Sequence, residues 1–300
     1  MEGRGWVGID ANPSVSVGCQ CVWYGPHCAM HASCPPLADI KANARALSQL
    51  LIDSRNVTKY GVHGLFGIFG SGDRIADNPA RRYFVNYEDT KVDFMYTHAC
   101  RFAKHVTRPT VCEIGFNAGL SALLLLESIP NARVLSFDLG DLPWSRAADK
   151  ILRKSYGAAR FPGVTFGDSK RTIPQVATKR PFRCDLSFVD GDKTYQGRYN
   201  TLVALRDVAS NQSVVFMDEV TSEACVNGTY ASDSAQHKRS CAALNHGYWP
   251  SVRAYNRACR EGWLRVQRCV WPRRHPHDGL CIGHISYLVR TYGLTIPLQG

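Results

Sequence analysis

Residues 110–121 read TVCEIGFNAGLS, and this stretch decides the fold. The segment 110–114 predicts a short buried strand, and the apolar run 122–126 predicts a helix that follows a glycine-bearing turn. Small residues let a backbone turn sharply and approach a ligand closely, and the next helix begins with free N–H groups. In this turn the small residues Gly115, Asn117 and Gly119 occupy alternate positions.

An acid, Glu113, lies near the end of the predicted strand. The glycines do not follow the G-x-G-x-x-G spacing that holds a pyrophosphate, and a carboxylate in the turn would repel phosphate groups. The stretch therefore favours a cationic or zwitterionic ligand. The alternative is an ordinary strand–helix corner of an α/β protein that binds nothing.

Strand and helix patterns alternate after this stretch. Further strands are predicted at 133–137, 164–166, 185–189 and 213–217, helices at 196–208 and 251–261, and two closing strands at 264–270 and 280–289. An amphipathic helix at 37–55 and a further helix at 87–105 precede the sheet, and the glycine-rich segment 61–72 between them is interpreted as a lid or a simple connector. The alternation predicts an α/β fold with a doubly wound, mostly parallel, seven-stranded sheet.

A carboxylate marks each of the first five strands, at Glu113, Asp138, Asp168, Asp190 and Asp218. Ligands of open α/β sheets bind beyond the carboxyl ends of the strands, so these acids predict a ligand site at that edge. Asp138 follows Gly119 by 19 positions (138 − 119), a place from which an acid can accept both ribose hydroxyls. Asp168 and Ser169 are placed to meet an adenine edge. The pattern predicts a nucleoside-bearing ligand without a phosphate anchor.

The order EIGFNAG, strand-Asp138, GDS and FVDGDK resembles the class I S-adenosylmethionine-dependent methyltransferases over roughly residues 85–290. The resemblance implies a Rossmann-like methyltransferase fold whose last two strands form an antiparallel hairpin. It also implies a cofactor site in which Asp138 holds the ribose, and Asp168 with Ser169 holds the adenine. The residues implied around the rest of the cofactor are Glu113, Gly115, Asn117, Gly119 and Asp190.

Asp190 and Asp218 stand 28 positions apart (218 − 190), with Lys193 shortly after the first and Glu219 beside the second. This layout is similar to catechol and caffeoyl-CoA O-methyltransferases, in which two acids and an Asn hold a divalent ion and a Lys takes a proton. The resemblance implies Mg²⁺ or another divalent cation on Asp190, Asp218 and Glu219, with Lys193 and Asp190 as catalytic residues. A hard cation prefers oxygen ligands and lowers the pKa of a bound hydroxyl.

Three alternatives stay open at this second site. Glu219 stands where the resembled families have Asn, so Asp192 could be the third ligand instead. The acids could also pair with Lys193 or an arginine and hold no ion. The enzyme would then act without metal, with Lys193 and an acid as base and orienter. Lys193 can act as a base only if its pKa is lowered.

Twelve cysteines are the unusual part of the composition. The stretch GCQCVWYGPHC resembles the closing half of an epidermal-growth-factor-like module, so residues 1–36 are predicted to be a Cys-rich remnant of one and 37–300 the methyltransferase domain. Disulfides are favoured over a zinc cluster with His27 and His31 for Cys19, Cys21, Cys28 and Cys34. Cys100, Cys112 and Cys184 fall in apolar contexts and are predicted to be buried thiols.

The chain carries a net charge of +11, with its basic residues scattered, so no nucleic-acid partner is expected. No apolar run reaches 18 residues, so no transmembrane segment is expected. Sequons at Asn56, Asn211 and Asn227 favour a luminal or extracellular location if an upstream segment is missing, and a cytoplasmic one otherwise. The implied acceptor is a hydroxyl of a small molecule or a glycan. The rival from another class is a secreted binding module without catalysis.

Overall fold

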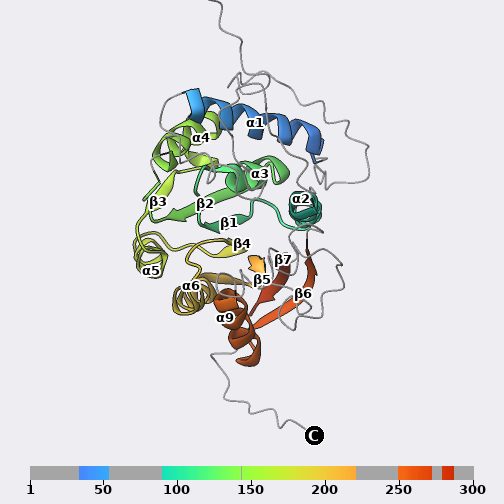
Figure 1. The fold of residues 1–300 in the computed structure, drawn as a ribbon, viewed down its shortest axis with the longest axis vertical. Helices are drawn as coiled ribbons and strands as arrows, with labels where there is room; N and C mark the ends of the chain where they lie inside the picture. Colours follow the sequence, from blue (N-terminus) through green and yellow to red (C-terminus); the bar gives the residue numbers. More distant parts are fainter. Residues whose placement is uncertain (1–33, 54–89, 143, 221–248, 272–278, 287–300) are drawn as a thin grey trace, which may run out of the picture.

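The computed structural model describes residues 34–53, 90–142, 144–220, 249–271 and 279–286 (Figure 1). The glycine-rich segment 61–72, the sequons at Asn56 and Asn227, and the first three cysteines lie outside these residues. The predictions made for those segments therefore stay predictions.

A single seven-stranded sheet in the order β3-β2-β1-β4-β5-β7-β6 forms the middle of the molecule. The first five strands are parallel, and β7 runs antiparallel between β5 and β6. The doubly wound, mostly parallel sheet with a C-terminal antiparallel hairpin is thus confirmed. The strands are β1 (Thr110–Ile114), β2 (Arg133–Asp138), β3 (Val164–Phe166), β4 (Cys184–Val189), β5 (Ala209–Val220), β6 (Leu264–Val270) and β7 (Gly279–Ile285).

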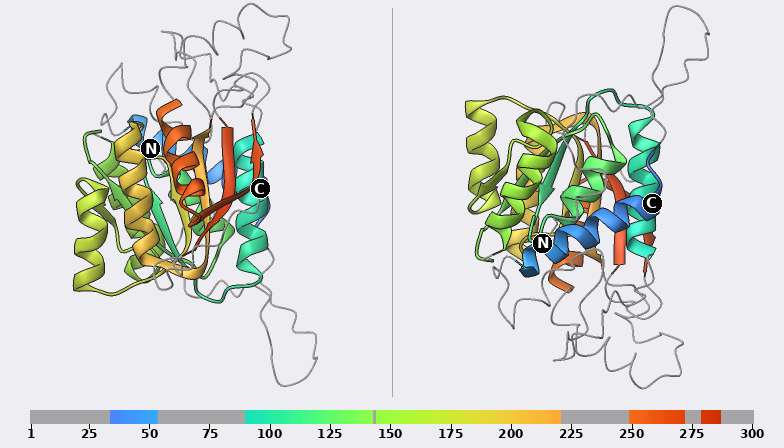
Figure 2. Two further views of the ribbon diagram at one scale, coloured as in Figure 1. Left: turned by 90° about the horizontal axis from the view of Figure 1, so that it is seen from below. Right: turned by 90° about the horizontal axis from the view of Figure 1, so that it is seen from above.

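Helices cover both faces of the sheet (Figure 1). One layer contains α1 (Leu37–Asp53), α3 (Leu120–Ser128) and α4 (Ser145–Arg160), and the other contains α5 (Ser169–Lys179), α6 (Tyr195–Val208) and α9 (Trp249–Arg260). Both views of Figure 2 place α2 (Thr90–Ala103, teal) on the side of β6 and β7 (red), and α2 contacts β6. None of the described helices is long and apolar enough to cross a membrane.

Burial explains why some elements were easier to predict than others. Eight of the nine residues of α3 are buried, because the helix lies between the sheet and the helices α1 and α2. In contrast, α5 buries only Ile173 among its described residues, and α4 buries three residues. Both helices are mainly polar in composition, and the sequence analysis assigned bounds to neither.

Two apolar clusters, one on each face of the sheet, form the core. Alternation along β1 sends Val111 to the α3 side, and Cys112 and Ile114 to the α6 side. Both faces of β1 and β4 are covered, so these strands read as nearly continuous apolar runs. The place where neighbouring strands lead to opposite layers, between β1 and β4, is where an open α/β sheet opens a crevice at its carboxyl edge.

Disulfides replace the predicted buried thiols. Cys34 is bonded to Cys100, and Cys112 is bonded to Cys184. The prediction of free thiols at positions 100, 112 and 184 was wrong, because an apolar sequence context indicates burial but not a partner 66 or 72 positions away. A third disulfide, Cys269–Cys281, joins directly paired residues of β6 and β7. Cys259 is a free thiol.

Candidate active site

The turn after β1 has the backbone shape that its small residues predict. Gly115, Asn117 and Gly119 all lie in the left-handed region, with φ of 94°, 51° and 77°. A Cβ on Gly115 would lie 2.5 Å from the carbonyl oxygen of Asp190. Only glycine therefore lets the ends of β1 and β4 meet, and the Asp190 amide donates to the Ile114 carbonyl at 2.8 Å across this junction.

Glu113 lies beneath this turn, fully buried. Its two carboxylate oxygens accept hydrogen bonds from Ser121 of α3 and Ser136 of β2, each at 2.5 Å. Burial raises the pKa of Glu113 to about 7, although the two serine hydroxyls act in the opposite direction. The carboxylate is thus held between the sheet and α3 and does not reach the open edge, where the resemblance had placed it against a cofactor.

Asp138 joins two neighbouring turns at the carboxyl edge. Its Oδ2 accepts from the Asn117 amide at 3.0 Å, and its Oδ1 accepts from the Gly140 amide at 2.7 Å. The side-chain oxygen of Asn117 in turn accepts from the Trp144 indole N–H at 2.6 Å. Asp138 is half-buried, and the next residue, Leu139, is 59% exposed. Leu139 is an apolar group at this edge that the sequence analysis did not single out.

Asp168 and Ser169 begin α5, on the outer side of the same edge. Asp168 is the N-cap, since its Oδ1 accepts from the Lys170 amide at 3.0 Å, and its side chain is 40% exposed. The Ser169 hydroxyl lies 3.1 Å from that of Thr201 on α6. Asp168 is therefore partly exposed, with its Oδ2 3.3 Å from the Lys170 ammonium, whereas the Ser169 hydroxyl is in contact with the neighbouring helix.

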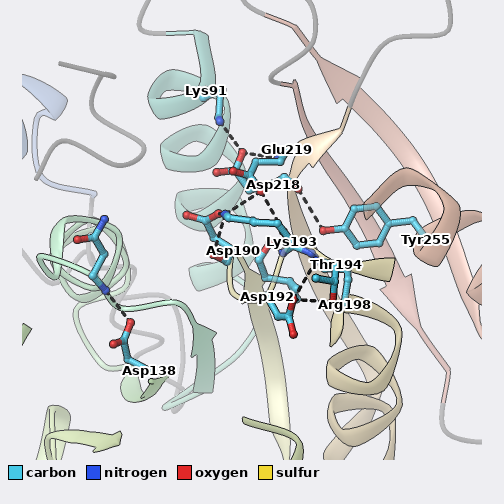
Figure 3. A network of polar contacts seen from close by, with 12 residues as sticks. Lys91, Asp138, Asp190, Asp192, Lys193, Thr194, Arg198, Asp218, Glu219 and Tyr255 are labelled. Atoms are coloured by element: carbon cyan, nitrogen blue, oxygen red, sulfur yellow. Dashed lines mark hydrogen bonds and ion pairs between the residues drawn. The ribbon is translucent and has the colours of Figure 1, made fainter. Parts of the chain in front are cut away.

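A cluster of alternating charges occupies the other side of the edge, set apart from Asp138 (Figure 3). We define the acid–cation cluster as Asp190, Asp218, Glu219, Lys91, Lys193 and Arg198. Lys193 is paired with Asp190, and its Nζ lies 2.7 Å from Oε2 of Glu219. The Nζ of Lys91 lies 2.5 Å from Oδ1 of Asp218, and a guanidinium nitrogen of Arg198 lies 3.1 Å from Glu219.

A β-bulge brings Asp218 and Glu219 into this cluster together. Asp218 pairs with Leu280 and Val220 pairs with Gly279, so Glu219 is the extra residue between them. Glu219 has a φ of 60°, and its amide donates to Oδ1 of Asp218 at 2.9 Å. Successive side chains of a regular strand point to opposite faces, and a bulge re-aims one of them. The bulge therefore lets two adjacent acids contribute to one cluster.

Arg198 and Tyr255 support the cluster from within the protein. Arg198 is completely buried in α6 and donates to the Val189 carbonyl at 2.9 Å as well as to Glu219. The Tyr255 hydroxyl of α9 donates to the backbone carbonyl of Asp218 at 3.1 Å. Sequence reasoning missed both residues. Arg198 lies in the first turn of α6 between Gly197 and Tyr199, and nothing in that local sequence signals a buried charge.

Lys193 is held in its charged form. Burial lowers its pKa, but the attraction of Asp190 and Glu219 is stronger, and the pKa of Lys193 is raised overall. The predicted role of Lys193 as a base required the opposite shift. Asp192 takes no part in the cluster, because its Oδ1 accepts from the amide and the hydroxyl of Thr194, both at 2.8 Å, just before α6.

Comparisons with known proteins agree with this architecture. A family described as "Methyltransferase domain" matches residues 112–220. A search of curated proteins gave no match.

Similar solved structures include the O-methyltransferase from Bacillus cereus in complex with SAH, at 14% identity and a TM-score of 0.53, covering 82% of this chain and 91% of that one. Cofactor-bound Rv0187 from MTB has 18% identity and a TM-score of 0.50, covering 82% and 89%. A candidate caffeoyl-CoA O-methyltransferase from Staphylococcus aureus has 12% identity and a TM-score of 0.50, covering 82% and 100%.

At identities this low, the similar structures establish the fold of this chain and nothing finer. The fold is the Rossmann-like methyltransferase fold. Within this methyltransferase fold, the Asp138 turn and the acid–cation cluster both lie at the carboxyl edge of the sheet, where the sequence analysis had placed the cofactor and the metal, respectively.

The acid–cation cluster of this methyltransferase fold does not fit a divalent ion. Each of the three predicted ligands, Asp190, Asp218 and Glu219, already contacts a lysine or arginine. Among the residues that the structure describes, no three His, Cys, Asp or Glu side chains are grouped in a way that could hold a metal. The ion-pair alternative for these acids is the one that the geometry supports.

Proposed function

We propose that this chain is an S-adenosylmethionine-dependent methyltransferase that methylates a hydroxyl group without a divalent ion. The observation that carries the proposal is the pair of features at one edge of the methyltransferase fold. One is the left-handed turn tied to Asp138, and the other is the acid–cation cluster beginning at Asp190. Gly115 joins them, because it packs directly against the Asp190 backbone.

The residues around the turn support binding of a nucleoside-bearing cofactor. Asp138 fixes two backbone amides and remains half-exposed, so its oxygens keep lone pairs for the hydroxyls of a ribose. Leu139 offers exposed apolar surface beside it, and Asp168, the N-cap of α5, offers a partly exposed carboxylate. Glu113 acts from beneath by holding Ser121 and Ser136. This assignment keeps the predicted cofactor edge and gives Glu113 a supporting role.

The second feature supports transfer to oxygen. S-adenosylmethionine supplies a methyl group on a positively charged sulfur, and an acceptor oxygen attacks it more readily once the hydroxyl has lost its proton. Lys193 has the most exposed side chain of the three cations, at 43% against 10% for Lys91 and 0% for Arg198. Its ammonium stabilises a neighbouring oxyanion, and Asp190 is the carboxylate that we assign to receive the proton. Lys193 is therefore a charge-stabilising residue in this proposal, and not the base.

The chemistry of the site and the disulfides both bear on the class of acceptor. The chemistry above suits any hydroxyl that can be ionised beside an ammonium, which includes phenols of small molecules and, less readily, sugar hydroxyls. The described disulfides are typical of proteins in oxidising compartments, which supports a location in the secretory pathway, where glycans are available acceptors. We therefore propose a small-molecule or glycan hydroxyl.

Methyl transfer from labelled S-adenosylmethionine, with and without EDTA, tests the function. Phenolic compounds and oligosaccharides serve as two acceptor panels, and calorimetry measures cofactor affinity separately. We expect transfer to at least one panel that is unchanged by EDTA. We expect Lys193→Met to lose most of kcat while keeping cofactor affinity, and Lys150→Met, a change of an exposed lysine on α4, to retain both.

Two outcomes would contradict the proposal in different ways. Absence of cofactor binding would leave the non-catalytic binding module as the better hypothesis. Activity that is lost with EDTA and restored by magnesium would return the site to the metal-dependent mechanism that the sequence predicted.

A further inference from the structure

Lys91 reaches the acid–cation cluster from an element that the sequence analysis did not connect with it. The residue lies in the first turn of α2, and its ammonium lies 2.5 Å from Oδ1 of Asp218. Figure 3 shows the two side chains facing one another, and they are only 10% and 5% exposed. Both charges are therefore largely removed from water. An isolated charge at such a position is costly, and each of these groups therefore depends on the other.

The charge count of the cluster shows what Lys91 contributes. Its three carboxylates, Asp190, Asp218 and Glu219, carry a formal charge of −3, and Lys193 and Arg198 together supply only +2. Both of these cations contact Glu219, and Lys193 also pairs with Asp190. Lys91 adds the third positive charge and places it on Asp218. With it the six described side chains are formally neutral.

Two physical arguments make this contact more than a chance surface pair. The N-terminal turn of a helix carries a partial positive charge, so an ammonium in that turn of α2 is disfavoured unless a nearby carboxylate compensates it. A divalent ion would also need oxygen ligands at about 2.0–2.6 Å, and it would be repelled by an ammonium that already lies against Asp218. Lys91 and a divalent ion therefore compete for the same carboxylate.

We infer that Lys91 is a built-in substitute for a divalent ion: an ammonium, carried by α2, that neutralises Asp218 in place of a metal. The inference rests on the proposed function only for its catalytic meaning, because the competition between the ammonium and a metal is a property of the folded protein alone. It makes Lys91 a positioning residue, which holds Asp218 and through it the bulge that carries Glu219.

Manganese binding tests this inference without any measurement of turnover. The probe is free Mn²⁺ followed by electron paramagnetic resonance, with purified full-length wild type and Lys91→Met. Methionine retains the apolar stem of lysine and removes its charge. We expect the wild type to show no Mn²⁺ binding at the cluster within the range of the titration. Lys91→Met should bind one ion per chain, with a Kd at least tenfold below the highest Mn²⁺ concentration at which the wild type still binds none. Adding Asp218→Asn to Lys91→Met should abolish the new binding.

Lys41→Met is the matched control. Lys41 also forms an ion pair between helices, with Asp93 of α2 at 3.4 Å, but its partner is 55% exposed and lies outside the cluster. It should gain no Mn²⁺ site. Near-ultraviolet circular dichroism of each variant shows whether it is folded, and Lys91→Arg, which keeps the charge, should behave as the wild type does.

Two results would overturn the inference. One is a wild type that binds one Mn²⁺ per chain and loses it in Asp218→Asn. The other is a folded Lys91→Met that binds no more Mn²⁺ than the wild type. If Lys91→Met does not fold, Mn²⁺ titration of the wild type and of Asp218→Asn still shows whether Asp218 is occupied by the Lys91 ammonium or by a metal ion. Failure of the proposed methyltransferase activity would appear separately, as absence of cofactor binding in a calorimeter.

Discussion

At the scale of single residues, Glu113 and Asp138 show two ways in which a carboxylate can organise the same turn. Glu113 acts from the interior, where both of its oxygens accept from serine hydroxyls and no solvent reaches it. Asp138 acts from the edge, where its oxygens accept from backbone amides of two loops. Both residues hold the backbone in place, but only Asp138 retains surface that a ligand could contact.

The raised pKa of Glu113 predicts a pH-dependent stability. Its pKa is about 7 in the folded protein against an ordinary value of 4.5, so the protonated form is favoured by folding. The corresponding stabilisation is fully present below pH 4.5 and is lost as the pH rises through 7, a total of about 3 kcal/mol. Glu113→Gln, which cannot ionise, should remove this component when urea unfolding is compared at pH 5 and pH 8. Parallel pH profiles for the two proteins would contradict the prediction.

Asp138→Ala should weaken binding of S-adenosylmethionine by about 1.5–3 kcal/mol, the range for a hydrogen bond to a charged group. The reason is twofold, because the change removes the proposed ribose contact and releases the amides of Asn117 and Gly140. Calorimetry on the folded variant measures the effect. Asp141→Ala, which removes an exposed acid from the same loop, is the control and should bind as the wild type does. An unchanged affinity in Asp138→Ala would remove Asp138 from the cofactor site.

At the scale of elements, the carboxyl edge of the sheet depends on contacts between parts that are distant in the sequence. Arg198 illustrates this, since one guanidinium on α6 contacts the end of β4 at Val189 and the bulge of β5 at Glu219. The ring of Tyr255 from α9 lies 5.7 Å from the same guanidinium. Three elements thus meet at one buried charge.

Arg198→Met should therefore destabilise the whole fold. It leaves Glu219 buried with one cation fewer, and removal of one partner from a buried ion pair costs about 3–5 kcal/mol. Urea unfolding should show this loss. Arg206→Met, on the same helix, removes a cation that pairs with the more exposed Asp207 and stacks on Trp263, and it should cost only about 1 kcal/mol. Equal costs for the two variants would mean that the buried contacts of Arg198 are not stabilising.

The sequence was sufficient for elements whose signal is local. Each of the seven strands overlaps the run predicted for it, although β5 (Ala209–Val220) extends beyond the predicted 213–217, and Asp138, Asp190 and Asp218 lie at or near the carboxyl ends of their strands. The bulge at Glu219 and the partners of Arg198 and Lys91 could not be predicted in this way. They depend on which helix lies beside which strand, and a single sequence contains no spacing rule for such contacts. The predicted metal ligands do form a cluster, together with the predicted Lys193, but its other two cations come from α2 and α6.

At the scale of the whole molecule, disulfides join elements on both sides of the switch point. Cys112 of β1 is bonded to Cys184 of β4, the two strands whose ends define the crevice. The first disulfide, Cys34–Cys100, joins the segment before α1 to α2, and the third joins β6 to β7. The fold is therefore cross-linked at its centre and near its edges.

Loss of the central disulfide should lower the stability substantially. Cross-linking two residues 72 positions apart restricts the unfolded chain, and chain-entropy arguments place the effect at about 4 kcal/mol for a loop of this length. The double variant Cys112→Ala, Cys184→Ala should show this loss in urea unfolding under non-reducing conditions. Cys259→Ala, which removes a free and partly buried thiol, should cost about 1 kcal/mol or less. Equal losses would argue against the disulfide.

The Cys34–Cys100 bond also makes the polypeptide between those positions a covalent ring. A single cut anywhere inside the ring leaves both pieces attached to one another, so α1 should stay with the sheet after the backbone is opened. An inserted protease site at position 70 would reveal this: one band on a gel without reductant and two bands with it. The carboxyl edge of the sheet would then belong to a two-chain protein made from one gene product. After reduction, only the packing of α1 against the core would hold its two pieces together.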